Sequence, residues 1–507
     1  MTRRTVPEGE RAPAWLAGLG VALAALRLLH LGGPLDDPHS WRQCDTAHYS
    51  LDFARHGIDL LHPAVCWLGQ HRVLIFEFPL PEALSALLQR AFGPGVVWDR
   101  AVALAFFLLA TGYFLAIARL VATRRAAALA TLAWLALPLG QYYARAAHVD
   151  FAATAFAHAL LYHALRALRA RSLPHALAAT AGGALAALIK APYVLPLLPP
   201  LALAWLAAPG LAAAALAGLP LAGTALAFAL WRRHVDAVNG AAPDWSFLPG
   251  YYKEVNPTWW YFGDLAQRLR PAGWVRIGQR MLHEVLTPAG VLLAAAGAAL
   301  RPAAAPWPGP RAFAFAWASG TLLFLLVFFP LNVIHDYYQI PFLAPAALFA
   351  GLGLDALWRR RPAAGVVALL AFLAVALWYV RVPGYYRVDW LRVEAGAAIA
   401  ARVPPGDLVA VSDHGSEYSD PRLLFRADRE GWALRMQDLT PPRLARLAGL
   451  GARWLAVVTD PEHPGLAPPA FLAPARTARV PVTHAGRTLG TLELFDLRSG
   501  PAGAGGR

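Results

Sequence analysis

Acidic, basic and aromatic side chains are concentrated in residues 39–49, directly after the apolar segment 14–31. This polar stretch contains Trp41, Arg42 and Asp45. A carboxylate placed here can take a proton from a hydroxyl or an amine, which is the task of a general base. An arginine nearby can stabilise the negative charge that grows on a phosphate leaving group. Asp45 could also be an ordinary helix-face carboxylate, but its place in a membrane-proximal loop favours a catalytic role.

Four further titratable residues are expected on the same side of the apolar segments as Asp45. Glu77 lies later in the same loop, and His148 and Asp150 lie where an apolar segment begins. Lys190 is a lone cation between apolar segments, where a charge costs ~2.5 kcal/mol or more at the centre of a bilayer. We therefore expect Lys190 to face a cavity or a partner, with extension to a lipid headgroup as the alternative. Glu77 and Asp150 join Asp45 as catalytic candidates.

Two aromatic segments offer further candidates for substrate binding. Residues 332–341 carry a histidine and two tyrosines, and residues 250–262 are dense in tyrosine and tryptophan. Such side chains can contact phosphate or sugar hydroxyls, but they also suit a polar hinge between spans or an aromatic belt at the membrane interface. The candidate substrate-binding residues are Trp41, Arg42, His148, Lys190, Tyr251, Tyr252, His335, Tyr337 and Tyr338.

No motif for a cofactor or a metal is present. The chain has no Cys/His cluster with zinc spacing, no phosphate-binding P-loop and no dinucleotide-binding glycine pattern. We expect no cofactor; a divalent metal is not indicated. The run from Ser412 to Ser416 follows a predicted strand and could mimic a catalytic loop, but no partner motif supports it. The only two cysteines, Cys44 and Cys66, both lie in the first outer loop. They either form a disulfide or stay unpaired.

Composition identifies a membrane protein. Of the 507 residues, 58% are hydrophobic and 15% are charged, whereas soluble proteins carry about 25% charged residues. Long apolar runs recur throughout, and the mean hydropathy is +0.43. The net charge of +14 does not indicate nucleic acid, because the arginines cluster in short loops between apolar runs.

These arginine clusters also predict the topology. Placing them all in the cytoplasm gives a cytoplasmic N-terminus, about eleven spans and an outward C-terminus, as expected for a bacterial inner-membrane protein. We interpret the first apolar segment as a retained anchor, because no convincing cleavage site follows it. The groups that set this orientation are Arg3, Arg4 and Arg11; Arg119, Arg124 and Arg125; Arg166, Arg169 and Arg171; Arg301 and Arg311; and Arg359, Arg360 and Arg361.

The expected fold is a polytopic α-helical membrane protein with a small C-terminal α/β domain outside the membrane. Asp37-Pro38 predicts the start of a helix with Arg42 and Asp45 on one polar face, and residues 81–92 predict an amphipathic helix in the interface. The expected parts are a transmembrane domain over 1–383 with outer loops 32–98 and 231–283, an α/β domain over 384–498 and a disordered tail over 499–507. Within the α/β domain we expect helices at 391–402 and 441–450, buried parallel strands at 408–412 and 454–458, and a late strand at 488–495.

The order of these motifs resembles that of the C-type membrane glycosyltransferases, specifically bacterial family 39-like proteins related to protein O-mannosyltransferases and lipid A aminoarabinose transferases. Their acidic motif in the first outer loop, often Asp-Glu, corresponds to Asp45-Thr46 here. Their Lys-Pro-Pro-Leu motif corresponds to Glu77-Phe78-Pro79-Leu80, so an acid replaces a family cation. A later Asp, a Thr-Lys-Gly-Pro motif and a Tyr-rich segment correspond to Asp150, residues 189–192 and residues 335–345.

This resemblance covers roughly residues 14–380. It implies transfer of a sugar from a polyprenyl-phosphate carrier to a lipid, glycan or protein acceptor on the outer face, with inversion and with Asp45 as the base. Because Glu77 replaces a lysine, Arg42 or Lys190 is expected to bind the phosphate. The alternative is a non-catalytic flippase, transporter or assembly protein for lipid-linked glycans. A transporter would more often carry charges deep in several spans and broken half-helices, whereas the titratable residues here are expected at one membrane face.

Overall fold

The computed structural model describes residues 12–300, 309–382 and 384–499. They form two compact units, each built from separate stretches of the chain. The helical unit comprises the described residues of Met1–Gly32, Arg100–Arg233 and Pro257–Tyr385. The loop–sheet unit comprises those of Gly33–Asp99, His234–Asn256 and Tyr386–Arg507. The N-terminal arginines, Arg301 and all but the first residue of the predicted tail lie outside the described residues.

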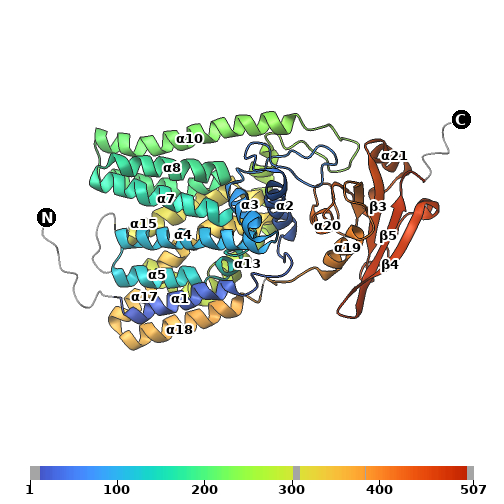
Figure 1. The fold of residues 1–507 in the computed structure, drawn as a ribbon. Helices are drawn as coiled ribbons and strands as arrows, with labels where there is room; N and C mark the ends of the chain where they lie inside the picture. The colour runs from blue at the N-terminus through green and yellow to red at the C-terminus, as the bar shows by residue number, and fades with distance from the viewer. Residues whose placement is uncertain (1–11, 301–308, 383, 500–507) are drawn as a thin grey trace. The chain divides into compact units, whose positions relative to one another are not determined.

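Long helices that run side by side make up the helical unit (Figure 1). Its longer helices are α1 (Ala14–Ala25), α4 (Val97–Val121), α5 (Arg124–Ala136), α7 (Asp150–Ala170), α8 (Leu173–Lys190), α9 (Leu198–Leu206), α10 (Leu211–Gly240), α13 (Pro271–Arg280), α14 (Thr287–Ala299), α15 (Pro310–Val327), α17 (Leu343–Arg360) and α18 (Pro362–Tyr379). Short helical segments α6 (Pro138–Tyr143), α11 (Thr258–Phe262), α12 (Leu265–Leu269) and α16 (Phe329–Ile334) connect them. Helix α10 continues to Gly240 and so includes the first ten residues of the predicted loop 231–283.

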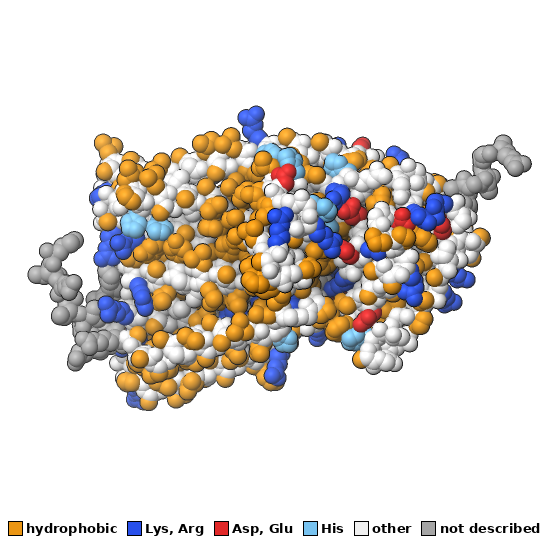
Figure 2. Space-filling model, viewed as in Figure 1, with side chains coloured by type: hydrophobic (Ala, Val, Ile, Leu, Met, Phe, Trp, Pro, Cys, Tyr) orange, Lys and Arg blue, Asp and Glu red, His pale blue; other side chains and the backbone are white. Residues whose placement is uncertain are grey.

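The described helices confirm a polytopic helical membrane protein. Six of them are long and apolar enough to cross a bilayer, and a seventh span results if the pair on either side of a 90° bend, Pro271–Val285 and Thr287–Ala299, counts as one. The expected count of about eleven is not confirmed. Other apolar segments form helices such as α1 and α5, with 12 and 13 residues, where a span needs about 20. Figure 2 shows mostly hydrophobic side chains over the long helices, with charged side chains gathered over the loop–sheet unit.

Glycines allow close packing between helices α14 and α17. A Cβ added at Gly297 would lie 2.0 Å from the Phe349 carbonyl oxygen, and one added at Gly353 would lie 2.1 Å from the Leu293 carbonyl oxygen. Each glycine therefore faces the backbone of the other helix. Small residues at such contacts are typical of membrane helices, whose association depends on close packing because lipid supplies no hydrophobic driving force.

The two predicted helices of the first outer loop are present. Helix α2 (Ser40–His56) begins three residues later than Asp37, although the Asp37 carboxylate still accepts a hydrogen bond from the Ser40 amide at 3.1 Å. Helix α3 (Leu80–Phe92) buries Ala83 and Ala86, whereas Leu84 and Leu87 on its other face are exposed. An amphipathic helix with an exposed apolar face suits the interfacial position predicted for this segment.

The C-terminal part of the loop–sheet unit is a five-stranded sheet of order β2-β1-β3-β5-β4. Its strands are β1 (Leu408–Ser412), β2 (Gly431–Ala433), β3 (Ala452–Thr459), β4 (Arg476–His484) and β5 (Arg487–Asp496), and its helices are α19 (Trp390–Ala400), α20 (Arg422–Ala427) and α21 (Pro441–Gly449). Strand β1 pairs in parallel with β2 and β3, and β5 pairs antiparallel with β3 and β4. This confirms the α/β domain and its predicted parallel strands, and adds β2, β4 and α20.

The first outer loop and the C-terminal sheet share one hydrophobic core. The Gly431 amide donates to the Cys66 carbonyl at 2.9 Å, and the Gly69 amide donates to the Gly431 carbonyl at 2.8 Å. Trp67, Trp245 and Trp432, from the three chain segments of this unit, belong to the same buried cluster. A Cβ at Gly69 would lie 2.1 Å from the Trp432 ring, so this contact requires glycine. The loop that carries Asp45 is therefore folded together with the sheet.

Candidate functional site

Asp45 is a buried carboxylate with one oriented oxygen. It lies on α2 and is 1% exposed. The Trp67 indole N–H donates to its Oδ1 at 3.0 Å, while its buried Oδ2 meets no hydrogen-bond donor among the described residues. Burial raises the pKa of Asp45 to about 7, against the opposing effects of the Arg42 charge and the Trp67 hydrogen bond. A carboxyl group that titrates near neutral pH, with one oxygen that accepts no hydrogen bond from the described residues, suits general base catalysis.

Helix α2 places Arg42 and Tyr49 on the same side as Asp45, at the i, i+3, i+7 spacing of one helix face. Arg42 forms an ion pair with Glu77, and its guanidinium lies 5.0 Å from the centre of the Phe76 ring. The Tyr49 hydroxyl donates to the Leu74 carbonyl at 2.5 Å, which holds the segment before Glu77 against the helix. Glu77 therefore holds the arginine that lies on the same helix face as Asp45.

A second cluster of charged residues lies in the helical unit around Asp150. The Lys190 ammonium is 2.8 Å from Asp150 Oδ1, and the Tyr193 hydroxyl donates to the same oxygen. His148 forms an ion pair with Asp150 Oδ2. Asp150 is the first residue of α7 and Lys190 is the last of α8. Each charge therefore has the sign that its helix end favours, negative at the N-terminus and positive at the C-terminus.

Tyrosine rings surround the Lys190 ammonium. It lies 4.4 Å from the centre of the Tyr338 ring, 4.7 Å from that of Tyr337 and 5.3 Å from that of Tyr193. These distances fit cation–π interactions, which stabilise a desolvated cation. The His335 ring stacks on Tyr337 with centroids 4.9 Å apart. A buried lysine held among aromatic rings and one carboxylate fits the expectation that this cation contacts a partner.

The sequence-predicted residues thus fall into two groups. The helical unit brings together His148, Asp150, Lys190, His335, Tyr337 and Tyr338, and the loop–sheet unit holds Trp41, Arg42, Asp45 and Glu77. Tyr251 packs edge-on against Tyr418 with ring centroids 5.1 Å apart, and Tyr418 packs in the same way against Trp67 at 5.4 Å. Tyr251 therefore packs, through Tyr418, against the tryptophan that donates to Asp45. A contact of Tyr252 with substrate stays a prediction.

Sequence reasoning missed three side chains that orient the candidate groups. Tyr193 follows Lys190 by three residues, a spacing that could have identified it. Tyr143 donates to Asp336 Oδ1 at 2.6 Å, and Trp67 donates to Asp45 from 22 residues away. Neither of these two contacts has a local sequence signal, because each depends on tertiary packing.

The two cysteines do not form a disulfide. Cys44 and Cys66 are both buried and unpaired, which is the second of the two expected alternatives. Burial raises the pKa of the Cys44 thiol to about 12, so this group is a packed, unreactive thiol rather than a nucleophile.

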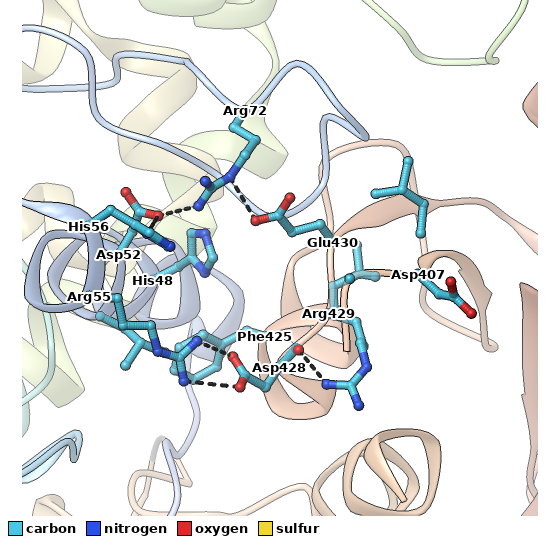
Figure 3. A pocket seen from close by; sticks show the side chains of 14 residues that line it. His48, Asp52, Arg55, His56, Arg72, Asp407, Phe425, Asp428, Arg429 and Glu430 are labelled. Atoms are coloured by element: carbon cyan, nitrogen blue, oxygen red, sulfur yellow. Dashed lines mark hydrogen bonds and ion pairs between the residues drawn. The ribbon is translucent and has the colours of Figure 1, made fainter. Parts of the chain in front are cut away.

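A polar cavity of about 170 Å³ lies within the loop–sheet unit, between α2 and residues 406–430 (Figure 3). Arg55 pairs with Asp428 at 2.6 Å, and Arg72 contacts both Asp52 and Glu430. Burial lowers the pKa of His48 to about 4, so this histidine is neutral at physiological pH. Because carboxylates balance these arginines, the cavity has no excess of positive charge to attract a phosphate.

Comparisons with known proteins bear on the fold. No protein-family model and no curated protein sequence matches this chain. Solved structures do match. The structure of ArnT from Cupriavidus metallidurans bound to undecaprenyl phosphate has a TM-score of 0.61 at 17% identity, over 95% of this chain and 97% of that one. The chain has the fold of the C-type membrane glycosyltransferases.

Two other structures share this C-type fold. The arabinofuranosyltransferase AftD from Mycobacteria has a TM-score of 0.60 at 16% identity, over 96% of this chain and 40% of that one. The archaeal oligosaccharyltransferase AglB from Archaeoglobus fulgidus, in complex with an inhibitory peptide and a dolichol-phosphate, has a TM-score of 0.55 at 13% identity. The match covers 89% of this chain and 70% of that one. The fold expected from the motif resemblance is confirmed, and the narrower likeness to family 39 stays a prediction.

Proposed function

We propose that this protein is an integral membrane glycosyltransferase. It would transfer a sugar from a polyprenyl-phosphate donor to a lipid, glycan or protein acceptor on the extracytoplasmic face of a bacterial inner membrane. The shared fold supports this, since ArnT has been captured with undecaprenyl phosphate and AglB with a dolichol-phosphate. The observation that carries the proposal is the buried Asp45 carboxylate, oriented by Trp67 and titrating near pH 7.

In the proposed reaction Asp45 acts as the general base. Its carboxylate takes the proton from an acceptor hydroxyl while the acceptor oxygen forms a bond to the anomeric carbon of the sugar. The bond from that carbon to the phosphate oxygen breaks, and its electron pair leaves on the polyprenyl phosphate. Attack opposite the leaving group inverts the anomeric configuration. General base catalysis of this kind contributes about 10²- to 10⁴-fold to a rate.

Cations are proposed to stabilise the phosphate as charge accumulates on it. Lys190 is the main candidate, because it is a buried ammonium whose neighbours His148, Tyr337 and Tyr338 can also contact phosphate or sugar oxygens. Arg42 is the second candidate cation. Asp150 and Glu77 each contact one of these cations, so we propose that they act by positioning it. No cofactor is needed for this scheme, and membrane lipids are the expected surroundings of both substrates.

In vitro transfer tests the proposal. Purified protein in lipid nanodiscs receives a panel of radiolabelled polyprenyl-phosphate sugars with membrane-derived acceptors. Wild type should release label from one donor, and Asp45→Asn should reduce that rate at least about 100-fold while remaining folded. Asp59→Asn, which changes an exposed carboxylate in the same loop, is the matched control and should transfer at the wild-type rate.

Two outcomes would count against this function. Equal transfer by wild type and Asp45→Asn would remove Asp45 from the mechanism. Saturable binding of a lipid-linked sugar by folded wild type, without label release from any donor, would favour a non-catalytic flippase, transporter or assembly protein.

A further inference from the structure

Three side chains with metal-ligand chemistry meet at one edge of the C-terminal sheet. His414 lies two residues after the end of β1, and Asp460 and His463 lie just after the end of β3. Strands β1 and β3 are parallel neighbours, so the loops at their carboxyl ends emerge at the same edge. His414 is thereby brought next to Asp460 and His463, which follow it by 46 and 49 positions in the sequence. Because of this separation, the sequence shows no metal-binding motif.

The geometry of the three residues is compact. His414 Nδ1 lies 3.0 Å from Asp460 Oδ2, and His463 Nδ1 lies 2.9 Å from Asp460 Oδ1. The two imidazole rings are parallel, 7° apart in plane, with centroids separated by 4.2 Å. One possible ligand atom from each of the three residues lies within 4.8 Å of the others. Ligand atoms of a tetrahedral zinc ion are about 3.3–3.6 Å apart, since each lies about 2.0–2.2 Å from the metal.

The loop that carries His414 is held in place by buried charges. Arg392 contacts both carboxylate oxygens of Asp413, at 2.6 and 3.0 Å. Asp413 Oδ1 in turn accepts from the Gly415 amide at 2.8 Å, and Arg422 donates to the Gly415 carbonyl at 3.1 Å. The position of His414 therefore does not depend on a ligand, and a preorganised position lowers the cost of binding one.

The second loop is also ordered by its own backbone. Asp460 Oδ1 accepts hydrogen bonds from the amides of Glu462 at 2.9 Å and His463 at 3.0 Å. The Asp460 side chain is mostly buried, at 7% exposure, whereas those of His414 and His463 are 29% and 44% exposed. The site thus has one oriented carboxylate at its base and two imidazoles open to solvent, which leaves room for water as a further ligand.

We propose that His414, Asp460 and His463 form a divalent transition-metal site, best suited to Zn²⁺, that ties the β1 and β3 loops together. Two imidazoles, one carboxylate and a water complete a tetrahedral donor set of the kind that zinc takes. The metal replaces the protons that the imidazoles otherwise share with Asp460. This site lies at the sheet edge and is independent of the proposed sugar transfer, in which none of its residues takes part.

Metal titration of the full-length protein tests this proposal. Protein purified with a histidine-free tag is stripped with a chelator, dialysed and titrated with Zn²⁺ by calorimetry, with metal content measured in parallel. We expect one Zn²⁺ per chain. His463→Gln and Asp460→Asn should each weaken binding by more than about 100-fold, because loss of even a supporting residue typically costs about 10- to 100-fold. Co²⁺ in place of Zn²⁺ should give the visible absorption of a tetrahedral site in wild type but not in His463→Gln or Asp460→Asn.

The matched control is His484→Gln in the same unit. His484 is similarly exposed and pairs with Glu394 at 2.8 Å, away from the three ligands. This variant should bind Zn²⁺ as wild type does, and Zn²⁺ should raise the melting temperature of both but not of His463→Gln. Absence of saturable binding by wild type, or wild-type affinity in a His414→Gln/His463→Gln variant with an unchanged metal-free melting temperature, would overturn the proposal.

Discussion

At the scale of single residues, the burial of Asp45 makes its proposed activity as a general base depend on pH near neutrality. Its pKa of about 7 places the switch between carboxylic acid and carboxylate within the physiological range. A general base acts only in its ionised form, so kcat/KM should rise with pH through about 7 and then level off. A pH–rate profile of wild type measures this. A rate independent of pH between about 5.5 and 8.5 would show that another group accepts the proton.

The same pKa predicts an effect on stability. In the unfolded chain the pKa of an aspartate is about 3.9. Because the folded pKa is higher, the contribution of Asp45 to stability is fully present below about pH 4 and is lost as pH rises through about 7. Asp45→Asn stays neutral at all pH values and should be more stable than wild type at about pH 8, by up to about 4 kcal/mol.

Melting temperatures of the two proteins at about pH 8 and pH 5.5 check this stability difference, which should shrink at the lower pH. Asp59→Asn serves again as the control, and its melting temperature should follow that of wild type at both pH values. A lower melting temperature for Asp45→Asn at about pH 8 would mean that the hydrogen bond from Trp67 outweighs the cost of burying the charge.

At the scale of elements, the ion pair between Asp150 and Lys190 joins the start of α7 to the end of α8. Lys190→Met would leave the fully buried Asp150 with His148 but without its lysine partner, and loss of one partner of a buried pair typically costs about 3–5 kcal/mol. The double variant Asp150→Asn/Lys190→Met removes both charges and should recover most of that stability. Thermal unfolding in detergent checks both variants.

Activity distinguishes a catalytic role of this pair from a structural one. If Lys190 binds the donor phosphate, the double variant should be stable and still inactive. Full transfer activity in the double variant would restrict the pair to holding α7 against α8, and would leave Arg42 as the remaining candidate cation.

At the scale of the whole molecule, the first outer loop depends on residues more than 350 positions away. The segment Cys66–Gly69 pairs with Gly431, and Trp67 shares a core with Trp432. Deletion of residues 386–507 should therefore expose the core of the outer loop and abolish transfer, even though no candidate catalytic residue is removed. Limited proteolysis should then cut within residues 33–99, whereas deletion of residues 500–507 alone should leave the cleavage pattern and activity unchanged.

A truncated protein that remained active with a protected outer loop would contradict this dependence. It would indicate that the loop folds without the sheet and that the C-terminal domain is an accessory. The division of the chain at residue 383 proposed from composition would then describe the functional parts better than the compact units do.

Features that depend on local patterns were predictable. The amphipathic period identified α3, and the apolar runs at 408–412 and 454–458 identified β1 and β3. Strand β2, with three residues, is too short to produce a pattern, and β4 contains Pro481 and alternates weakly, as edge strands do. The span count is not confirmed, because an apolar run does not show whether its helix is long enough to cross a bilayer or is bent, as at Leu286–Thr287.

The sequence by itself determined that this protein folds in lipid and which residue types could do chemistry, since hydropathy and isolated charges such as Asp45 and Lys190 are properties of the residues themselves. Only the tertiary structure decided how those residues behave. The pKa of Asp45 depends on burial and on a hydrogen bond from Trp67, and Lys190 acquires Asp150 from another helix. The cluster of His414, Asp460 and His463 likewise exists only because β1 and β3 are adjacent. Burial, pKa and coordination depend on distances in space, which spacing along the chain does not specify.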